Sequence, residues 1–193
     1  REEGFNSGSI FQLSDNGLIS GFNIVDMPNS DRAIFVATTP NGVANIQNCA
    51  FIGDDNNFKS FIHNSDSNVT ISDCSFIGNA WVAVECTSQS TTCFENCIFR
   101  ENKNGVISNI NGIIELNNCV ITDNFSYSDG AIYSCGKATI TNCQIRNNLR
   151  YGEKIGLDIF SNYDSELTII NEGESEGYYY QCFTGEKIRD SSY

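Results

Sequence analysis

The amino-acid sequence predicts one right-handed parallel β-helix, an all-β solenoid of about six to seven coils of 22–29 residues. A dipeptide of Asn or Asp followed by Cys recurs five times, and its cysteines lie 25, 23, 22 and 24 residues apart. Each copy lies among short alternating segments rich in Ile, Val, Thr and Phe, which are typical of strands. A repeat of this length with short strands matches one turn of a solenoid, and parallel crossovers are right-handed in nearly all proteins.

The repeated unit reads Ile-x-Asn-Cys-x-Phe-x-x-Asn, and a second apolar segment precedes each copy. Those preceding segments are residues 33–36, 61–62, 82–84, 106–107 and 131–133. A degenerate copy at 18–24 has Phe22 at the Cys position, and another at 167–172 has Glu172 there. We expect residues at one phase of the repeat to stack ~4.8 Å apart in parallel sheets around an apolar interior.

The residue before each repeated cysteine forms the first predicted ladder. Asn tolerates left-handed backbone angles and forms local hydrogen bonds at bends, so we interpret this ladder as structural. Its members are Asn48, Asp73, Asn96, Asn118 and Asn142.

The repeated cysteines form the next column, whose members are Cys49, Cys74, Cys97, Cys119 and Cys143. Strand alternation points them inward, where Cys acts as a small apolar residue. Neighbours would fall within disulfide range, but parallel Cβ vectors favour free buried thiols. Cys86 and Cys135 are expected at one phase two coils apart, and Cys86 with Cys93 is the better disulfide candidate. The chain has nine cysteines, one histidine and no CxxC motif, so we expect neither a metal site nor a cofactor.

The last position of the unit forms a second structural ladder of Asp54, Asn79, Asn102, Asn124 and Asn148. Gly53-Asp54-Asp55 is similar to the paired-Asp motif of pectin hydrolases, but the repeat accounts for Asp54 without catalysis.

The repeat resembles that of the chlamydial polymorphic membrane proteins and of related protist surface proteins. Segments 76–79 and 99–102 match their Phe-x-x-Asn motif, 121–124 and 145–148 match it with Ile for Phe, and 129–133 resembles Gly-Gly-Ala-Ile. The resemblance covers roughly residues 31–150. It implies a pectate-lyase-like right-handed β-helix with a surface adhesin or structural role.

The net charge of -13 and the pI near 4.3 disfavour a nucleic-acid partner, because phosphate binding depends on Lys and Arg. No segment approaches the ~20 apolar residues that span a bilayer. Asn68-Val69-Thr70 and Asn124-Phe125-Ser126 are glycosylation sequons. The resemblance implies a surface location with which these sequons agree, so we expect an extracellular or cell-surface protein that contacts other protein subunits or surface glycans.

The sequence favours a non-catalytic scaffold, and it leaves a carbohydrate-processing enzyme as the alternative. For a calcium-dependent lyase the candidates are Glu101 and Asp123, at one phase on adjacent coils, with Arg100 nearby. An exposed charged face explains the same residues. Trp81 is either a packing residue or an exposed platform for a sugar ring. Residues 1–177 are expected to form a single β-helix domain, and 178–193 a C-terminal cap or the start of a further module.

Overall fold

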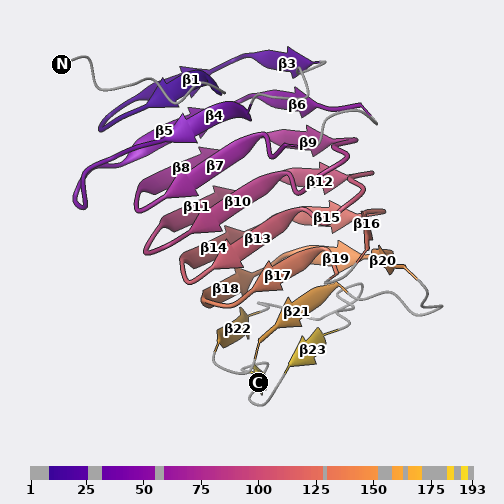
Figure 1. The fold of residues 1–193 in the computed structure, drawn as a ribbon. Helices are drawn as coiled ribbons and strands as arrows, with labels where there is room; N and C mark the ends of the chain where they lie inside the picture. The colour runs from indigo at the N-terminus through magenta and orange to yellow at the C-terminus, as the bar shows by residue number, and fades with distance from the viewer. Residues whose placement is uncertain are drawn as a thin grey trace.

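A computed structural model of the chain describes residues 9–25, 32–54, 59–127, 130–151, 158–162, 165–170, 182–184 and 188–190. Over these residues the chain forms short parallel strands that wind around one axis, with no helix among them (Figure 1). The predicted fold class is confirmed.

Each full coil contributes one strand to each of three parallel sheets. Sheet A contains β1 (Ser9–Leu13), β4 (Arg32–Val36), β7 (Ile62–Ser65), β10 (Val84–Thr87), β13 (Ile107–Ile110), β17 (Ile132–Ser134), β21 (Ile159–Ser161) and β23 (Cys182–Thr184). Sheet B contains β2 (Leu18–Ser20), β5 (Ala44–Gln47), β8 (Asn68–Ser72), β11 (Thr91–Glu95), β14 (Ile113–Asn117), β18 (Lys137–Thr141), β22 (Glu166–Ile170) and β24 (Ile188–Asp190). Sheet C contains β3 (Asn23–Val25), β6 (Ala50–Ile52), β9 (Ser75–Ile77), β12 (Ile98–Arg100), β15 (Val120–Thr122) and β19 (Gln144–Arg146).

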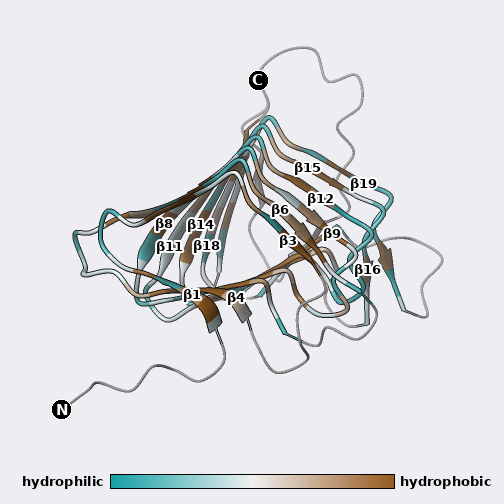
Figure 2. Ribbon diagram, turned by 90° about the horizontal axis from the view of Figure 1, so that it is seen from above, coloured by the Kyte–Doolittle hydropathy of each residue, from teal (hydrophilic) through white to brown (hydrophobic). Residues whose placement is uncertain are grey.

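A short additional pair, β16 (Phe125–Ser126) with β20 (Leu149–Arg150), lies after sheet C and before the next strand of sheet A. Seen from above, the three large sheets enclose a roughly triangular interior (Figure 2). Strands β23 and β24 lie beyond residue 177 and pair with β21 and β22, so sheets A and B continue past that position.

The core is built from side chains that stack on the same repeat position of the next coil. The rings of Phe51, Phe76 and Phe99 are fully buried and stack with centroid distances of 4.8 and 4.7 Å. Burying one such side chain contributes roughly 1.5–3 kcal/mol to stability. The repeated Phe of the sequence unit is therefore a continuous internal column.

Among the described residues, no helix has the length and apolar character needed to cross a membrane.

Candidate functional site

The first ladder forms the corner between sheets B and C. Its five members have φ angles of 53°, 53°, 53°, 55° and 52° in chain order, in the left-handed region that Asn and Asp tolerate. In the degenerate first coil Gly21 takes this position with φ 75°. The Nδ2 atom of Asn96 donates to Oδ1 of Asp73 over 3.2 Å. These side chains lie at the surface, and their shared backbone geometry accounts for the residue type.

The cysteine column is buried, with 0–3% of each side chain exposed. The eight cysteines whose side chains the structure describes are free thiols, so Cys86 and Cys93 do not form the candidate disulfide. Burial raises the pKa of the Cys74 thiol to about 12. The raised pKa suppresses thiolate, the reactive form, at Cys74, and the buried cysteines of the column pack as small apolar side chains.

The expected shared phase of Cys86 and Cys135 is wrong. Cys86 pairs in register with Asn109, and Asn109 pairs with Ser134, so Cys135 lies one residue further on. Because successive side chains of a strand alternate, Cys86 is fully buried whereas Cys135 is partly exposed.

The second ladder is a buried chain of amide hydrogen bonds formed by Asn79, Asn102, Asn124 and Asn148. The backbone N–H of Asn79, Asn102 and Asn124 each donates to Oδ1 of the next asparagine, over 3.0, 3.0 and 3.1 Å. The chain ends where Nδ2 of Asn148 donates to Oδ1 of the buried Asp158 over 2.7 Å. Asp54 differs from the four asparagines because its side chain is exposed.

Glycosylation at Asn124 is incompatible with this fold. Only 2% of Asn124 is exposed, and its Nδ2 donates to Phe99 O, Thr122 O and Oδ1 of Asn148 at 2.9–3.1 Å. A glycan would replace one of the two hydrogens on that nitrogen, break part of this hydrogen bonding and need space that the buried side chain does not have. Asn68 is half-buried, and its Nδ2 donates to the carbonyls of Pro40 and Gly42. Glycosylation at Asn68 stays a prediction.

The lyase candidates occupy the corner after sheet C. Glu101 and Asp123 have φ angles of 59° and 56°, and Gly78 takes the same position one coil earlier with φ 69°. Both carboxyl groups thus belong to a second left-handed corner. Arg100 points outward from β12, with Nη1 3.9 Å from Oε1 of Glu101 at the surface. In the part of the chain that the structure describes, no three His, Cys, Asp or Glu side chains form a group suited to a metal ion.

The outer face of sheet A carries a column of side chains that are aromatic, charged or polar, unlike the uniform Asn and Cys ladders. Register places one residue of each strand from β4 to β21 in it, namely Phe35, His63, Glu85, Ser108, Tyr133 and Phe160. This column could not be predicted from the sequence, because the segments that precede the Asn-Cys units share no fixed motif.

His63 and Glu85 form a polar pair within this column. Nδ1 of His63 lies 3.0 Å from Oε2 of Glu85, and Ser60 Oγ donates to the same oxygen over 3.1 Å. The ring of Phe35 stacks on His63 with a centroid distance of 5.7 Å and an interplanar angle of 11°. These contacts fix the imidazole on the sheet surface.

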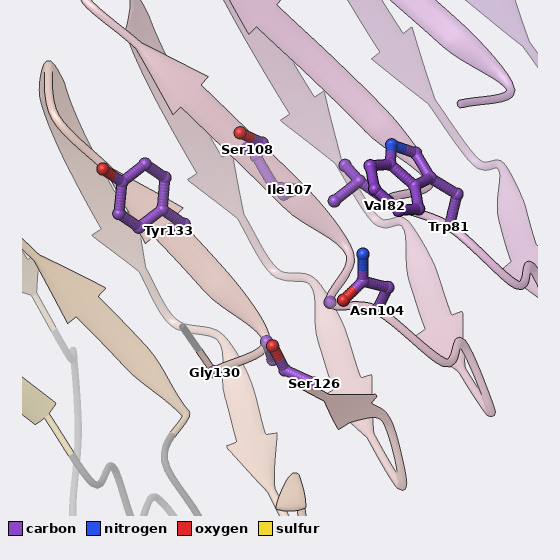
Figure 3. A pocket seen from close by; sticks show the side chains of 10 residues that line it. Trp81, Val82, Asn104, Ile107, Ser108, Ser126, Gly130 and Tyr133 are labelled. Atoms are coloured by element: carbon purple, nitrogen blue, oxygen red, sulfur yellow. The ribbon is translucent and has the colours of Figure 1, made fainter. Parts of the chain in front are cut away.

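A hollow of about 300 Å³ lies next to this pair, over the N-terminal ends of β10, β13 and β17 (Figure 3). Ser108, the register partner of Glu85, is one of its lining residues. The lining consists of Trp81, Val82, Asn104, Gly105, Ile107, Ser108, Ser126, Gly130, Ala131 and Tyr133. Glu101, Asp123 and Arg100 do not line it.

Two aromatic rings stand at opposite sides of the hollow, with Ser108 and Asn104 between them (Figure 3). Trp81 is 41% exposed. Tyr133 stacks on Phe160 with a centroid distance of 5.7 Å, and its hydroxyl accepts from Cys135 Sγ over 2.7 Å. Thus one ring faces solvent at the rim and the other is held in place on the sheet. The hollow and the His63–Glu85 pair together form the candidate site.

A family model for the right-handed β-helix region matches residues 8–172. Neither the curated proteins nor the solved structures give a significant match to this chain.

Proposed function

The chain belongs to the right-handed β-helix family, and from that premise we propose that it is a non-catalytic scaffold of an extracellular or cell-surface protein. It would serve adhesion or the building of an extracellular filament, with other protein subunits or surface glycans as partners. The resemblance to chlamydial and protist surface repeats, carried by segments such as 76–79 and 99–102, supports this role.

The observation that carries the proposal is the unbroken stacking of side chains through the described coils. The buried asparagine ladder spans four coils, and the Phe stack and the cysteine column run beside it. Such stacking favours a stiff rod whose outer columns present side chains at a regular spacing of ~4.8 Å per coil. A stiff surface with regular spacing suits repeated contact with an extended partner.

The corner geometry of the lyase candidates also supports a non-catalytic role. Glu101 and Asp123 adopt left-handed angles at positions where Gly78 and Asn147 also adopt them, so their place in the repeat has a conformational reason. The net charge of -13 favours a soluble, well-hydrated surface over contact with nucleic acid.

A carbohydrate-processing enzyme is the second candidate, and the His63–Glu85 pair favours it. The pair is half-buried and lies one register step from Ser108 in the hollow. A carboxylate that orients a histidine is a recurrent arrangement in acid–base catalysis. Under this alternative His63 would move the proton and Glu85 would orient it.

One experiment separates the two candidates. The purified chain is incubated with insoluble polysaccharides and with immobilised extracellular glycoproteins, and both retention and the release of reducing ends are measured. We expect retention without release. Release that saturates with substrate, and that Glu85→Gln or His63→Ala abolishes, would establish the enzyme instead. If nothing is retained, and light scattering detects no self-assembly, the scaffold proposal fails.

A further inference from the structure

We propose that the hollow over sheet A binds a neutral oligosaccharide, with Trp81 and Tyr133 as its two stacking surfaces. The inference rests on the proposed function and names the chemical class of one of its partners. It depends on the composition of the lining, on the placement of the two rings and on the charge of the chain.

The two rings offer flat apolar surfaces in a concave, solvent-accessible part of the molecule. Trp81 leaves 41% of its surface exposed at the rim, although a large indole is usually mostly buried. Tyr133 stacks on Phe160, and its hydroxyl accepts a hydrogen bond from Cys135 Sγ. Flat rings held in this way suit the C–H faces of sugar rings and lose little entropy on binding.

Between the rings the lining supplies polar groups without charge. The side chains of Asn104 and Ser108 carry amide and hydroxyl groups, which both donate and accept hydrogen bonds. Sugar hydroxyls have the same dual character. An apolar surface with a few convergent polar groups is the usual composition of a small-ligand site.

Charge selects neutral sugars over acidic ones. No charged side chain occurs among the described residues that line the hollow, and the chain as a whole carries -13. Carboxylates and phosphates are normally held by Arg or Lys, and a field of the same sign repels them. Uronic acid polymers, phosphosugars and nucleotides are therefore disfavoured. Glu85, which lies in β10 as the register partner of Ser108, adds to this repulsion.

The separation between the coils that carry the two rings indicates the size of the ligand. Trp81 directly precedes β10, whereas Tyr133 lies in β17, two strands away in sheet A. Two coil steps amount to roughly 10 Å along the helix axis. A ligand in contact with both side chains must span this separation and cross β13, which suits an oligosaccharide that runs along the axis.

Trp81 provides a direct measurement, because it is the single tryptophan of the chain. The full chain is titrated with neutral hexasaccharides (β-glucan, β-mannan and α-glucan) and with an oligogalacturonate of equal length. Tryptophan emission and calorimetry are recorded together. We expect at least one neutral hexasaccharide to shift the emission and to bind more tightly than the oligogalacturonate.

Variants locate the binding. Trp81→Ala is expected to weaken binding by roughly tenfold, the scale of one aromatic contact, and Trp81→Phe to restore part of it. Ile113→Ala, at a 39% exposed residue on the outer face of sheet B, is the control and should bind as the wild type does. Circular dichroism and thermal unfolding establish that each variant is folded.

Each contrary result has a definite meaning. Preference for oligogalacturonate, binding that Trp81→Ala leaves unchanged, or binding of extended peptides instead would overturn the inference. Failure of every neutral hexasaccharide at millimolar concentration would also overturn it. If the folded chain is still retained on glycoprotein or polysaccharide surfaces in that case, the proposed function stands. Saturable cleavage of a bound hexasaccharide would refute the non-catalytic scaffold while leaving the binding site in place.

Discussion

The Oδ1 atom of Asn124 accepts two hydrogen bonds from Asn102, one from its backbone N–H at 3.0 Å and one from its side-chain amide at 2.9 Å. Asn148 accepts the same pair from Asn124, at 3.1 and 2.9 Å. Asn124 and Asn148 thus each accept both kinds of donor from the preceding asparagine, whereas Asn102 accepts the backbone N–H of Asn79, whose Nδ2 donates to the carbonyls of Lys59 and Val82. This reciprocity explains why the last position of the repeat is Asn rather than another polar residue.

Replacement of Asn124 by Ala should destabilise the protein by at least about 2 kcal/mol. The change leaves the backbone N–H of the buried Asn102 without its acceptor, and one unsatisfied buried group costs about 1–3 kcal/mol. Urea unfolding followed by circular dichroism measures the loss. Gln144→Ala, at an exposed residue of sheet C, is the control and should change stability by less than about 0.5 kcal/mol. A similarly small effect at Asn124 would contradict the ladder's role.

The left-handed corner between sheets B and C predicts different effects on stability for two substitutions of Asn96. Its φ of 53° costs an ordinary L-residue about 1–2 kcal/mol, which glycine does not pay. We expect Asn96→Gly to keep stability close to that of the wild type and Asn96→Val to lower the melting temperature by several degrees, on the order of 2–4 °C per kcal/mol. Scanning calorimetry compares the two. Equal melting temperatures would show that the left-handed angle does not select the residue.

The part of the fold that could be predicted is the part with a fixed sequence phase. Each Asn-Cys dipeptide combines an exposed left-handed corner with a buried side chain, and both demands recur at the same register in each coil, as at Asn96 and Cys97. The stacking of Phe51, Phe76 and Phe99 follows from the same phase. Constraints of this kind act within a single repeat, so they can be recognised in the sequence without knowing the lengths of the connecting turns.

The candidate site depends on register across turns of unequal length, which the sequence does not reveal. His63 and Glu85 are 22 residues apart, whereas Ser108 and Tyr133 are 25 apart, and their strands share no marker residue. The same uncertainty about turn length explains why the phase expected for Cys135 was wrong by one residue. The role of Asp158 could not be predicted either. Its carboxylate accepts the hydrogen bond from Asn148 that the asparagine of a further repeat would accept.

Thiol labelling should divide the cysteines into two groups in the native protein. Six of the described cysteines are buried, whereas Cys93 and Cys135 are partly exposed. We expect Ellman's reagent at pH 8 to react with Cys93 and Cys135 before unfolding and with the other six only in guanidinium, because the thiolate must be accessible. Mass spectrometry of labelled peptides assigns the sites. Rapid native labelling of Cys97 would mean that the column is open to solvent.

Alkaline pH should weaken the fold through the same buried thiols. Burial raises the pKa of Cys86 to about 12, whereas an unfolded cysteine ionises near 8.5. The native state therefore holds the proton more tightly, so this contribution is fully present below pH ~8.5 and is lost as the pH rises toward 12. For Cys86 alone the slope approaches about 1.4 kcal/mol per pH unit in that window.

Cys74 contributes to this loss in the same direction, because burial also raises its pKa. Urea unfolding at several pH values between 8 and 11 measures the decline. Cys86→Ala is expected to start from a lower stability, since it leaves a small cavity, but to lose less of it per pH unit. A variant with the same alkaline slope as the wild type would assign the decline to other groups, such as tyrosines and lysines.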